Sequence, residues 1–298
     1  MKKINSLLKI LLPIILFTAC VPKQEQIEIN PYIIEKNGKP WIIAHGGAKD
    51  LFPENTMIAF QGSMAIGVDM LEMDVNLTKD GILITQHDLT IDGVTDGTGN
   101  VIDYTFEGLK QFNFGYDFKD LDGNYAYRNQ QVEVTKLESV MTTFPNTPLM
   151  VELKNRETDG KNAADELWRL IQLYNFEDKI IVVAFDDATL SYFQEISNDA
   201  VLISTSEEET KDFVFSALSA MDYTYSPKAS AVAIPMENSG IDLTKKRVIN
   251  AAHRRNMAVH YWTIDDKADM KLLIKNGADG LITDRPDLMH EVLVELGF

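Results

Sequence analysis

The chain has 298 residues, of which 45% are hydrophobic and 24% charged, so it can form one large globular domain or two smaller ones. Its formal net charge of -17 argues against nucleic acid as a partner, because a phosphate-binding surface needs clustered Lys and Arg. A phosphate-containing substrate would therefore need local positive charge, and a bound metal ion is the most direct source of it.

The first part of the chain has the pattern of a signal peptide. Lysines within residues 1–9 precede an apolar run, 10–17, that is too short to span a membrane. The run ends just before Cys20, the only cysteine, and this arrangement resembles a bacterial lipoprotein signal. We expect residues 1–19 to be removed and Cys20 to carry acyl chains that hold the protein at the cell membrane, on its extracytoplasmic face. The alternative is an ordinary secretory signal with an incidental cysteine.

The segment that follows Cys20 is short and polar around residues 24–26, and we interpret 20–38 as a tether. With a single cysteine, the mature protein can form no internal disulfide in any compartment. The folded domain is predicted to cover 39–298, and the sequence leaves its oligomeric state open.

From Trp41 onward, strand-like and helix-like segments alternate, which predicts a parallel sheet with helices outside it. Eight such units in about 250 residues fit a closed (β/α)8 barrel. An open doubly wound sheet would usually carry a G-x-G-x-x-G loop after its first strand, and His45-Gly46-Gly47 lacks that spacing. The predicted strands are 41–45, 70–77, 82–87, 148–154, 180–185, 201–204, 231–235, 258–264 and 280–283, and the predicted helices are 56–66, 163–174, 188–196, 207–221, 243–255 and 268–276.

Residues 89–135 interrupt this rhythm with aspartates, glycines and aromatic side chains. Long irregular loops inside compact domains are usually functional, so we interpret this segment as a small insertion or lid on the catalytic rim. A surface excursion with its own hydrophobic cluster is the alternative.

Two strands carry acids at alternate positions. Glu72 and Asp74 share one face of a strand although their neighbours are apolar, and Glu152 with Lys154 repeats the spacing in a later strand. Buried acids without a cation are costly, so three converging carboxylates favour a hard divalent cation, Mg²⁺ or Ca²⁺, rather than zinc. A structural ion pair between Lys154 and one acid is the alternative.

Two histidines, His45 and His87, each close an apolar strand. Beside paired acids, this position favours acid–base catalysis. His253 and His290 lie in helical stretches and are expected to face solvent, whereas His260 lies in a strand.

Together these residues resemble the glycerophosphodiester phosphodiesterase family, from about Trp41 to the C-terminus. The resemblance rests on His45-Gly46-Gly47, Pro53-Glu54-Asn55-Thr56, Gly67-Val68-Asp69 to Glu72-Met73-Asp74, Thr78-Lys79-Asp80-Gly81, His87-Asp88, Glu152-Leu153-Lys154, Tyr261-Trp262-Thr263 and Gly277-Ala278-Asp279-Gly280.

The resemblance implies a (β/α)8 barrel with an insertion after the strand at 82–87. It makes Glu72, Asp74 and Glu152 the ligands of one divalent cation. It also makes His45 and His87 the general base and acid. One histidine would activate the glycerol hydroxyl beside the phosphate and the other would protonate the departing alcohol. A cyclic phosphate would then yield to water.

The resemblance also implies secondary roles and shows two departures. Glu54 would orient glycerol or His45, Lys154 would add charge at the phosphate, and Trp262 would form an apolar wall. The family usually has Arg where this chain has Gly46, and glycine cannot make the fork-like phosphate contacts of Arg. Lys154 or Arg156 would have to compensate, or the metal would hold the phosphate. The second, milder departure is Ala184, where a small hydroxyl residue is common.

Three functions follow. The first is metal-dependent hydrolysis of glycerophosphodiesters, a small-molecule substrate, to glycerol 3-phosphate and an alcohol. The second keeps the chemistry but acts on lysophospholipids or teichoic-acid-type polymers, which the membrane anchor and the aromatic insertion favour. The third is a lipoprotein that binds phosphodiesters without turnover, for which the missing Arg argues.

Overall fold

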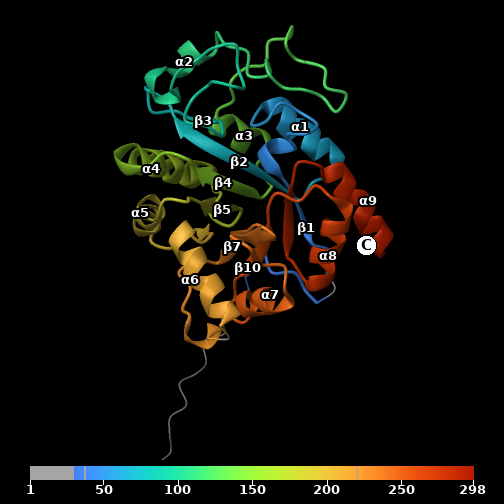
Figure 1. The fold of residues 1–298 in the computed structure, drawn as a ribbon. Coiled ribbons are helices and arrows are strands. Elements are labelled where there is room, and N and C mark those ends of the chain that lie inside the picture. The colour runs from blue at the N-terminus through green and yellow to red at the C-terminus, as the bar shows by residue number, and fades with distance from the viewer. Residues whose placement is uncertain (1–29, 37, 220) are drawn as a thin grey trace, which may run out of the picture.

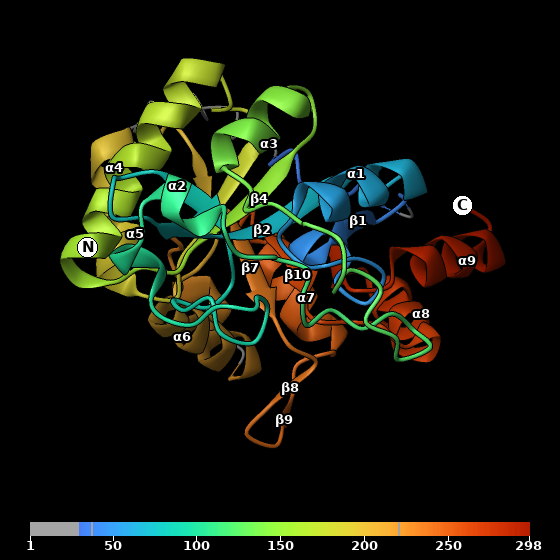
Figure 2. The ribbon, with the colours of Figure 1, turned by 90° about the horizontal axis from the view of Figure 1, so that it is seen from above.

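The computed structural model describes residues 30–36, 38–219 and 221–298, and it confirms the (β/α)8 barrel. Eight parallel strands lie in the order β6-β5-β4-β2-β1-β11-β10-β7. A single bridge between Ser204 and Ala231 joins the two ends of this order and brings the barrel close to closure (Figure 2). The strands are β1 (Trp41–Ala44), β2 (Met70–Leu77), β4 (Leu149–Leu153), β5 (Ile180–Val183), β6 (Leu202–Ile203), β7 (Ala231–Ile234), β10 (Ala258–Tyr261) and β11 (Gly280–Thr283).

Both faces of these strands are covered, which explains their uninterrupted apolar runs. Alternate residues face the barrel interior, where Ile43, Met70 and Ile181 pack together. The residues between them, such as Leu71 and Val151, pack in the larger cluster with the apolar faces of the helices. Because the alternation continues along each strand, polar residues near the carboxyl ends project toward one end of the barrel.

Helices cover the outside of the barrel (Figure 1). Side-chain oxygens that accept backbone N–H groups set where several of them begin, as with Thr56 at α1 and Asp186 at α5. The helices of the barrel are α1 (Met57–Ile66), α3 (Leu137–Thr143), α4 (Glu157–Tyr174), α5 (Asp187–Ser197), α6 (Glu207–Leu218), α7 (Lys246–His253), α8 (Lys267–Asn276) and α9 (Pro286–Leu296).

The predicted helix 243–255 is wrong in its first turn. A β-hairpin, β8 (Glu237–Asn238) and β9 (Ile241–Asp242), precedes it, and α7 begins only at Lys246. Its tip, Ser239-Gly240, has positive φ angles of 52° and 78°, which suits a tight turn between the two strands. Figure 2 shows the hairpin projecting from the barrel.

The insertion 89–135 forms a small unit beside β3 (Leu83–Thr85), which pairs antiparallel with β2. It contains η2 (Val101–Asp103) and α2 (Phe106–Leu109). Apolar residues from this segment form a hydrophobic cluster of their own, which includes Phe114 and Val132 and is separate from the barrel core. The insertion thus has its own hydrophobic cluster, as the second interpretation expects.

Residues 30–36, at the end of the predicted tether, pack against the barrel. Tyr32 is buried in the interior cluster, with its ring 5.5 Å from that of Trp41. Cys20 and the predicted signal lie outside the described residues. Within the part of the chain that the structure describes, no helix combines the length and the apolar character needed to cross a bilayer.

Candidate active site

A cavity of about 360 Å³ opens at the carboxyl ends of the strands. Seven predicted site residues line it: His45, Glu72, Asp74, His87, Glu152, Lys154 and Trp262. Six of them come from the parallel strands β2 and β4 or from the turns that follow β1, β4 and β10, whose carboxyl ends meet at one rim. His87 follows β3, which pairs antiparallel with β2. The prediction that these seven side chains meet at one end of the barrel is therefore confirmed.

Glu72, Asp74 and Glu152 form a compact acidic group, because each offers an oxygen within 4.8 Å of the others. Neighbouring N–H groups hold the other oxygens of the β2 acids. The amide N–H of Gly46 donates to Glu72 Oε2 at 2.8 Å, and the Asn55 side chain donates to Asp74 Oδ2 at 3.0 Å. This arrangement leaves carboxylate oxygens directed at a shared centre, as a cation site requires.

Burial makes this negative charge costly. Desolvation, followed by the charge of Asp74, raises the pKa of Glu72 to about 8. The same two causes raise the pKa of Glu152. Lys154 lies against the group, with Nζ 2.8 Å from Glu152 and 3.4 Å from Asp74.

The donor set fits a hard divalent cation. All three ligands would be carboxylate oxygens, which Mg²⁺ and Ca²⁺ prefer over the nitrogen and sulfur ligands of zinc. Oxygens on opposite sides of such an ion lie about 4–5 Å apart, in line with the observed spacing of at most 4.8 Å. One ammonium group offsets only part of the charge of three acids, so a cation would relieve the remaining repulsion. The ion pair with Lys154 and a metal site are therefore compatible.

His45 is held by a carboxylate that the sequence reasoning missed. Its Nδ1 lies 2.7 Å from Asp284 Oδ1, and because a carboxylate only accepts, Nδ1 carries a proton. Burial alone would lower the pKa of His45, but the hydrogen bond to Asp284 and the charge of Glu72 raise it to about 9. The second histidine, His87, is more exposed and has Nδ1 2.9 Å from Asp88.

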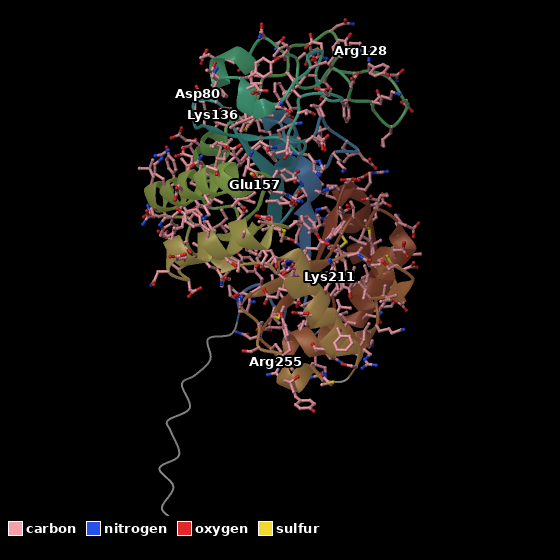
Figure 3. All side chains as sticks on the ribbon, turned by 60° about the vertical axis from the view of Figure 1, so that its left-hand side comes forward. Asp80, Arg128, Lys136, Glu157, Lys211 and Arg255 are labelled. Atoms are coloured by element: carbon pink, nitrogen blue, oxygen red, sulfur yellow. The ribbon has the colours of Figure 1, made fainter. Side chains whose placement is uncertain are left out.

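The rest of the cavity is mainly apolar, with an ion pair beside its aromatic wall. Phe185 and Trp262 meet edge to face, with ring centroids 6.3 Å apart. Beside Phe185, whose carbonyl accepts the backbone N–H of Glu207 at 3.3 Å, α6 contributes Lys211 and Glu207, whose charged groups lie 2.6 Å apart. Figure 3 shows Lys211 on the surface of this helix. The cavity thus joins a wall of acids and histidines to an apolar wall and an outer ion pair.

Two other residues with predicted roles, Glu54 and Arg156, do not line this cavity. Glu54 lines a neighbouring cavity of about 350 Å³, shared with Lys49 and with the insertion. Arg156, proposed as a substitute for the family's Arg, precedes α4 and is not among the lining residues of the main cavity. Gly46 adopts φ +51°, and a Cβ there would lie 3.5 Å from that of Glu54. Among the described residues, Lys154 is the lysine whose ammonium group pairs with Glu152 and Asp74.

His253 and His290, expected to face solvent, are only partly exposed. The Nε2 atom of His253 lies 2.8 Å from the buried carboxylate of Asp279, and the Nε2 atom of His290 is buried. His260 is fully buried on β10, and desolvation lowers its pKa to about 4. None of these three histidines lines the cavity.

A model of the glycerophosphoryl diester phosphodiesterase family matches residues 45–288. A Bacillus altitudinis protein named glycerophosphodiester phosphodiesterase is 29% identical, over 86% of this chain and 98% of that protein. A human protein named lysophospholipase D GDPD3 is 23% identical, over 84% of each chain.

Solved structures share the fold. A glycerophosphoryl diester phosphodiesterase domain from Mycobacterium tuberculosis has a TM-score of 0.75 at 19% identity, covering 86% of this chain and 99% of that one. An Oleispira antarctica phosphodiesterase, solved with the product sn-glycerol-3-phosphate, has a TM-score of 0.68 at 20% identity, covering 86% and 97%.

Proposed function

The chain belongs to the glycerophosphoryl diester phosphodiesterase family, and we propose that it hydrolyses glycerophosphodiesters to glycerol 3-phosphate and an alcohol. One observation carries this proposal. The cavity brings two histidines, from separate strand ends, to the same wall as three carboxylates and a lysine. Phosphodiester cleavage needs groups that transfer protons and a cation that stabilises the charge on the phosphate, and this arrangement can provide both.

In the proposed reaction the histidines act as a pair. One imidazole removes a proton from the glycerol hydroxyl next to the phosphate, so that its oxygen attacks phosphorus. The other imidazole gives a proton to the alcohol oxygen as its bond to phosphorus breaks. A cyclic phosphate results, and water opens it with the two roles reversed. Asp284 supports His45 in this task by fixing the ring and by favouring its protonated form.

Glu72, Asp74 and Glu152 are the residues that would hold one divalent cation, Mg²⁺ or Ca²⁺. When bound, the cation would polarise the phosphoryl oxygens and neutralise developing charge. Lys154 adds a fixed positive charge beside Asp74 and Glu152. This matters because Gly46 brings no guanidinium to the phosphate.

We place the enzyme at the cell membrane, held on the extracytoplasmic face by lipid on Cys20. The apolar run before this single cysteine supports the assignment. Two acyl chains are enough for stable anchoring. Labelling with a radioactive or clickable fatty acid tests it, and Cys20→Ser should remove the label.

The catalytic proposal is tested with purified protein and glycerophosphocholine. We expect release of glycerol 3-phosphate only when a divalent cation is present, and a loss of about 10³-fold or more in His45→Ala. Asp50→Asn is the matched control, because it removes a charge near the site at a residue that lines only the neighbouring cavity. Full turnover in excess chelator, or unchanged turnover in His45→Ala, would refute the mechanism.

A second substrate class, lysophospholipids, is favoured by the apolar wall at Phe185 and Trp262 and by the name of the human relative. Comparing rates on glycerophosphocholine and on its acylated form separates the two. If acyl chains bind this wall, Phe185→Ala should slow the acylated substrate selectively, whereas a uniform effect on both would argue against this class.

A further inference from the structure

The amino-terminal end of the barrel carries an exposed surface in which apolar and cationic side chains are mixed. Two of its aromatic residues are largely exposed, Phe215 by 70% and Tyr223 by 73%. Scattered apolar residues are ordinary on a protein surface, but a group of them beside cations marks a contact surface. We call it the entry surface and define it by Phe215, Met221, Tyr223, Lys228, Lys246 and Arg255.

Specific contacts join the parts of this surface. Arg254 pairs with Asp222 at 2.8 Å, and Arg255 donates to the carbonyl of Asp222 at 2.7 Å. Arg247 donates to the Ala217 carbonyl near the end of α6. These bonds hold the end of α6, the turn η3 (Asp222–Thr224) and α7 together. In Figure 3, Arg255 lies far from Arg128 of the insertion.

The described chain enters the fold beside this surface. The side chain of Asn30 donates to the carbonyls of Ser230 and Asn256, at the starts of β7 and β10. Asn256 directly follows Arg255. The ten peptide steps from Cys20 to Asn30 can span at most about 35 Å. A lipid on Cys20 would therefore keep the entry surface close to the bilayer.

The charge of this end differs from that of the whole chain. The formal net charge is -17, yet residues 221–230 and 242–256 contain six Lys or Arg against two acids, Asp222 and Asp242, which pair with Arg254 and Lys245. Anionic lipids attract clustered cations and repel the acidic remainder of the protein. Aromatic and methionine side chains at the same place suit the interfacial layer of a bilayer.

We propose that the entry surface rests on an anionic membrane, so that the catalytic cavity opens away from the bilayer. The catalytic residues lie toward or just beyond the carboxyl ends of their strands, whereas the entry surface is formed by the segments that lead into the amino ends of β7 and β10. The enzyme would then take water-soluble diesters or polymers from the space beyond the membrane. This orientation rests on the lipid anchor and on the catalytic site of the proposed function.

The test uses the full lipidated chain, in which the thioether blocks Cys20. Tyr223→Cys and Leu121→Cys, on the entry surface and the insertion, each receive an environment-sensitive fluorophore. In vesicles of phosphatidylcholine with phosphatidylglycerol, we expect brominated acyl chains to quench the probe at 223 several-fold more than the probe at 121. Equal quenching, or stronger quenching at 121, overturns the proposal.

Charge reversal gives a second, independent measurement. We expect Lys228→Glu combined with Lys246→Glu to lower quenching at 223 about tenfold in the anionic vesicles, and Lys119→Glu combined with Lys161→Glu to change it little. Equal quenching in anionic vesicles and in pure phosphatidylcholine would overturn the proposal. A probe at 223 that is shielded on intact cells but unquenched in vesicles would also overturn it, and would indicate a protein partner. All variants should hydrolyse glycerophosphocholine in detergent solution at the rate of the parent protein. If the parent protein itself shows no turnover, the catalytic proposal fails and the membrane proposal is not affected.

Discussion

The Nδ1 atom of His45 lies 2.7 Å from Asp284 Oδ1, although 239 positions separate the two residues in the chain. Their proximity follows from the sheet. Strands β1 and β11 are parallel neighbours, and Ala44 pairs with Thr283. The next residue on each strand is therefore His45 on one and Asp284 on the other. The bond occupies Nδ1, so Nε2 is the ring nitrogen left to exchange a proton with a substrate.

Asp284→Asn should lower kcat by about 10–100-fold, because an amide neither fixes the same ring form nor stabilises the imidazolium. It should also lower the pKa of His45 from its present value of about 9, since the hydrogen bond and charge of Asp284 both raise it. The corresponding limb of the pH profile of kcat/KM should move to lower pH. A loss of activity with an unchanged profile would mean that Asp284 acts only on structure. Asp50→Asn is again the matched control.

Cation binding should strengthen as pH rises toward about 8. The raised pKa of Glu72 means that the cation competes with a proton below that value. Without cation, the fold binds more protons than the unfolded chain at Glu72 between about 4.5 and 8, and at His45 between 6.5 and about 9. Stability should therefore fall as pH rises through both windows.

Thermal denaturation with and without Mg²⁺ or Ca²⁺, at several pH values, measures both effects. We expect the cation-induced rise in Tm to grow from pH 6 to about pH 8. Glu72→Gln should remove most of it, whereas Glu54→Gln, which alters an acid outside the cluster, should keep it. A pH-independent rise, or one that survives Glu72→Gln, would contradict the assignment of the ligands.

Local sequence patterns predicted much of the fold and site. Glu72 and Asp74 could be placed on one face because strand residues alternate, and in β2 the residue between them, Met73, packs outside the barrel interior. Asp284 follows an apolar strand just as His45 does, so the same strand-end rule could have found it. The pairing of Asp284 with His45 could not be predicted from the local sequence, because it depends on which strands become neighbours in the barrel.

Other features depend on contacts that a linear pattern does not contain. Asn55 fixes Asp74 through two hydrogen bonds across 19 positions, but in the sequence it looks like an ordinary turn residue. The hairpin before α7 was missed because its strands are two residues each and exposed, which leaves no periodic signal. Phe185 reaches the cavity only through the position of its strand in the barrel.

Gly46→Arg should tighten substrate binding at some cost in stability. A side chain at this position has room, since its Cβ would lie 3.5 Å from that of Glu54, but φ is +51°. The backbone strain should cost about 1 kcal/mol and lower Tm by a few degrees. Gly46→Ala carries the same strain without the guanidinium. We expect KM for glycerophosphocholine to be severalfold lower in the Arg variant than in the Ala variant, and equal KM values would show that Lys154 and the cation already suffice.

The ion pair of α6 should select the charge of the departing alcohol. Lys211 and Glu207 line the cavity 2.6 Å apart and are both more than half exposed, so the effect of each should be modest. Lys211→Met leaves the carboxylate, which favours cationic headgroups, and Glu207→Gln leaves the ammonium, which disfavours them. The ratio of kcat/KM for glycerophosphocholine to that for glycerophosphoglycerol, whose departing alcohol is uncharged, should rise about two- to fivefold in the first variant and fall in the second. High salt should erase both changes, because the groups are solvent-screened. Shifts in the same direction in the two variants would place the departing alcohol elsewhere in the cavity, against Phe185 and Trp262.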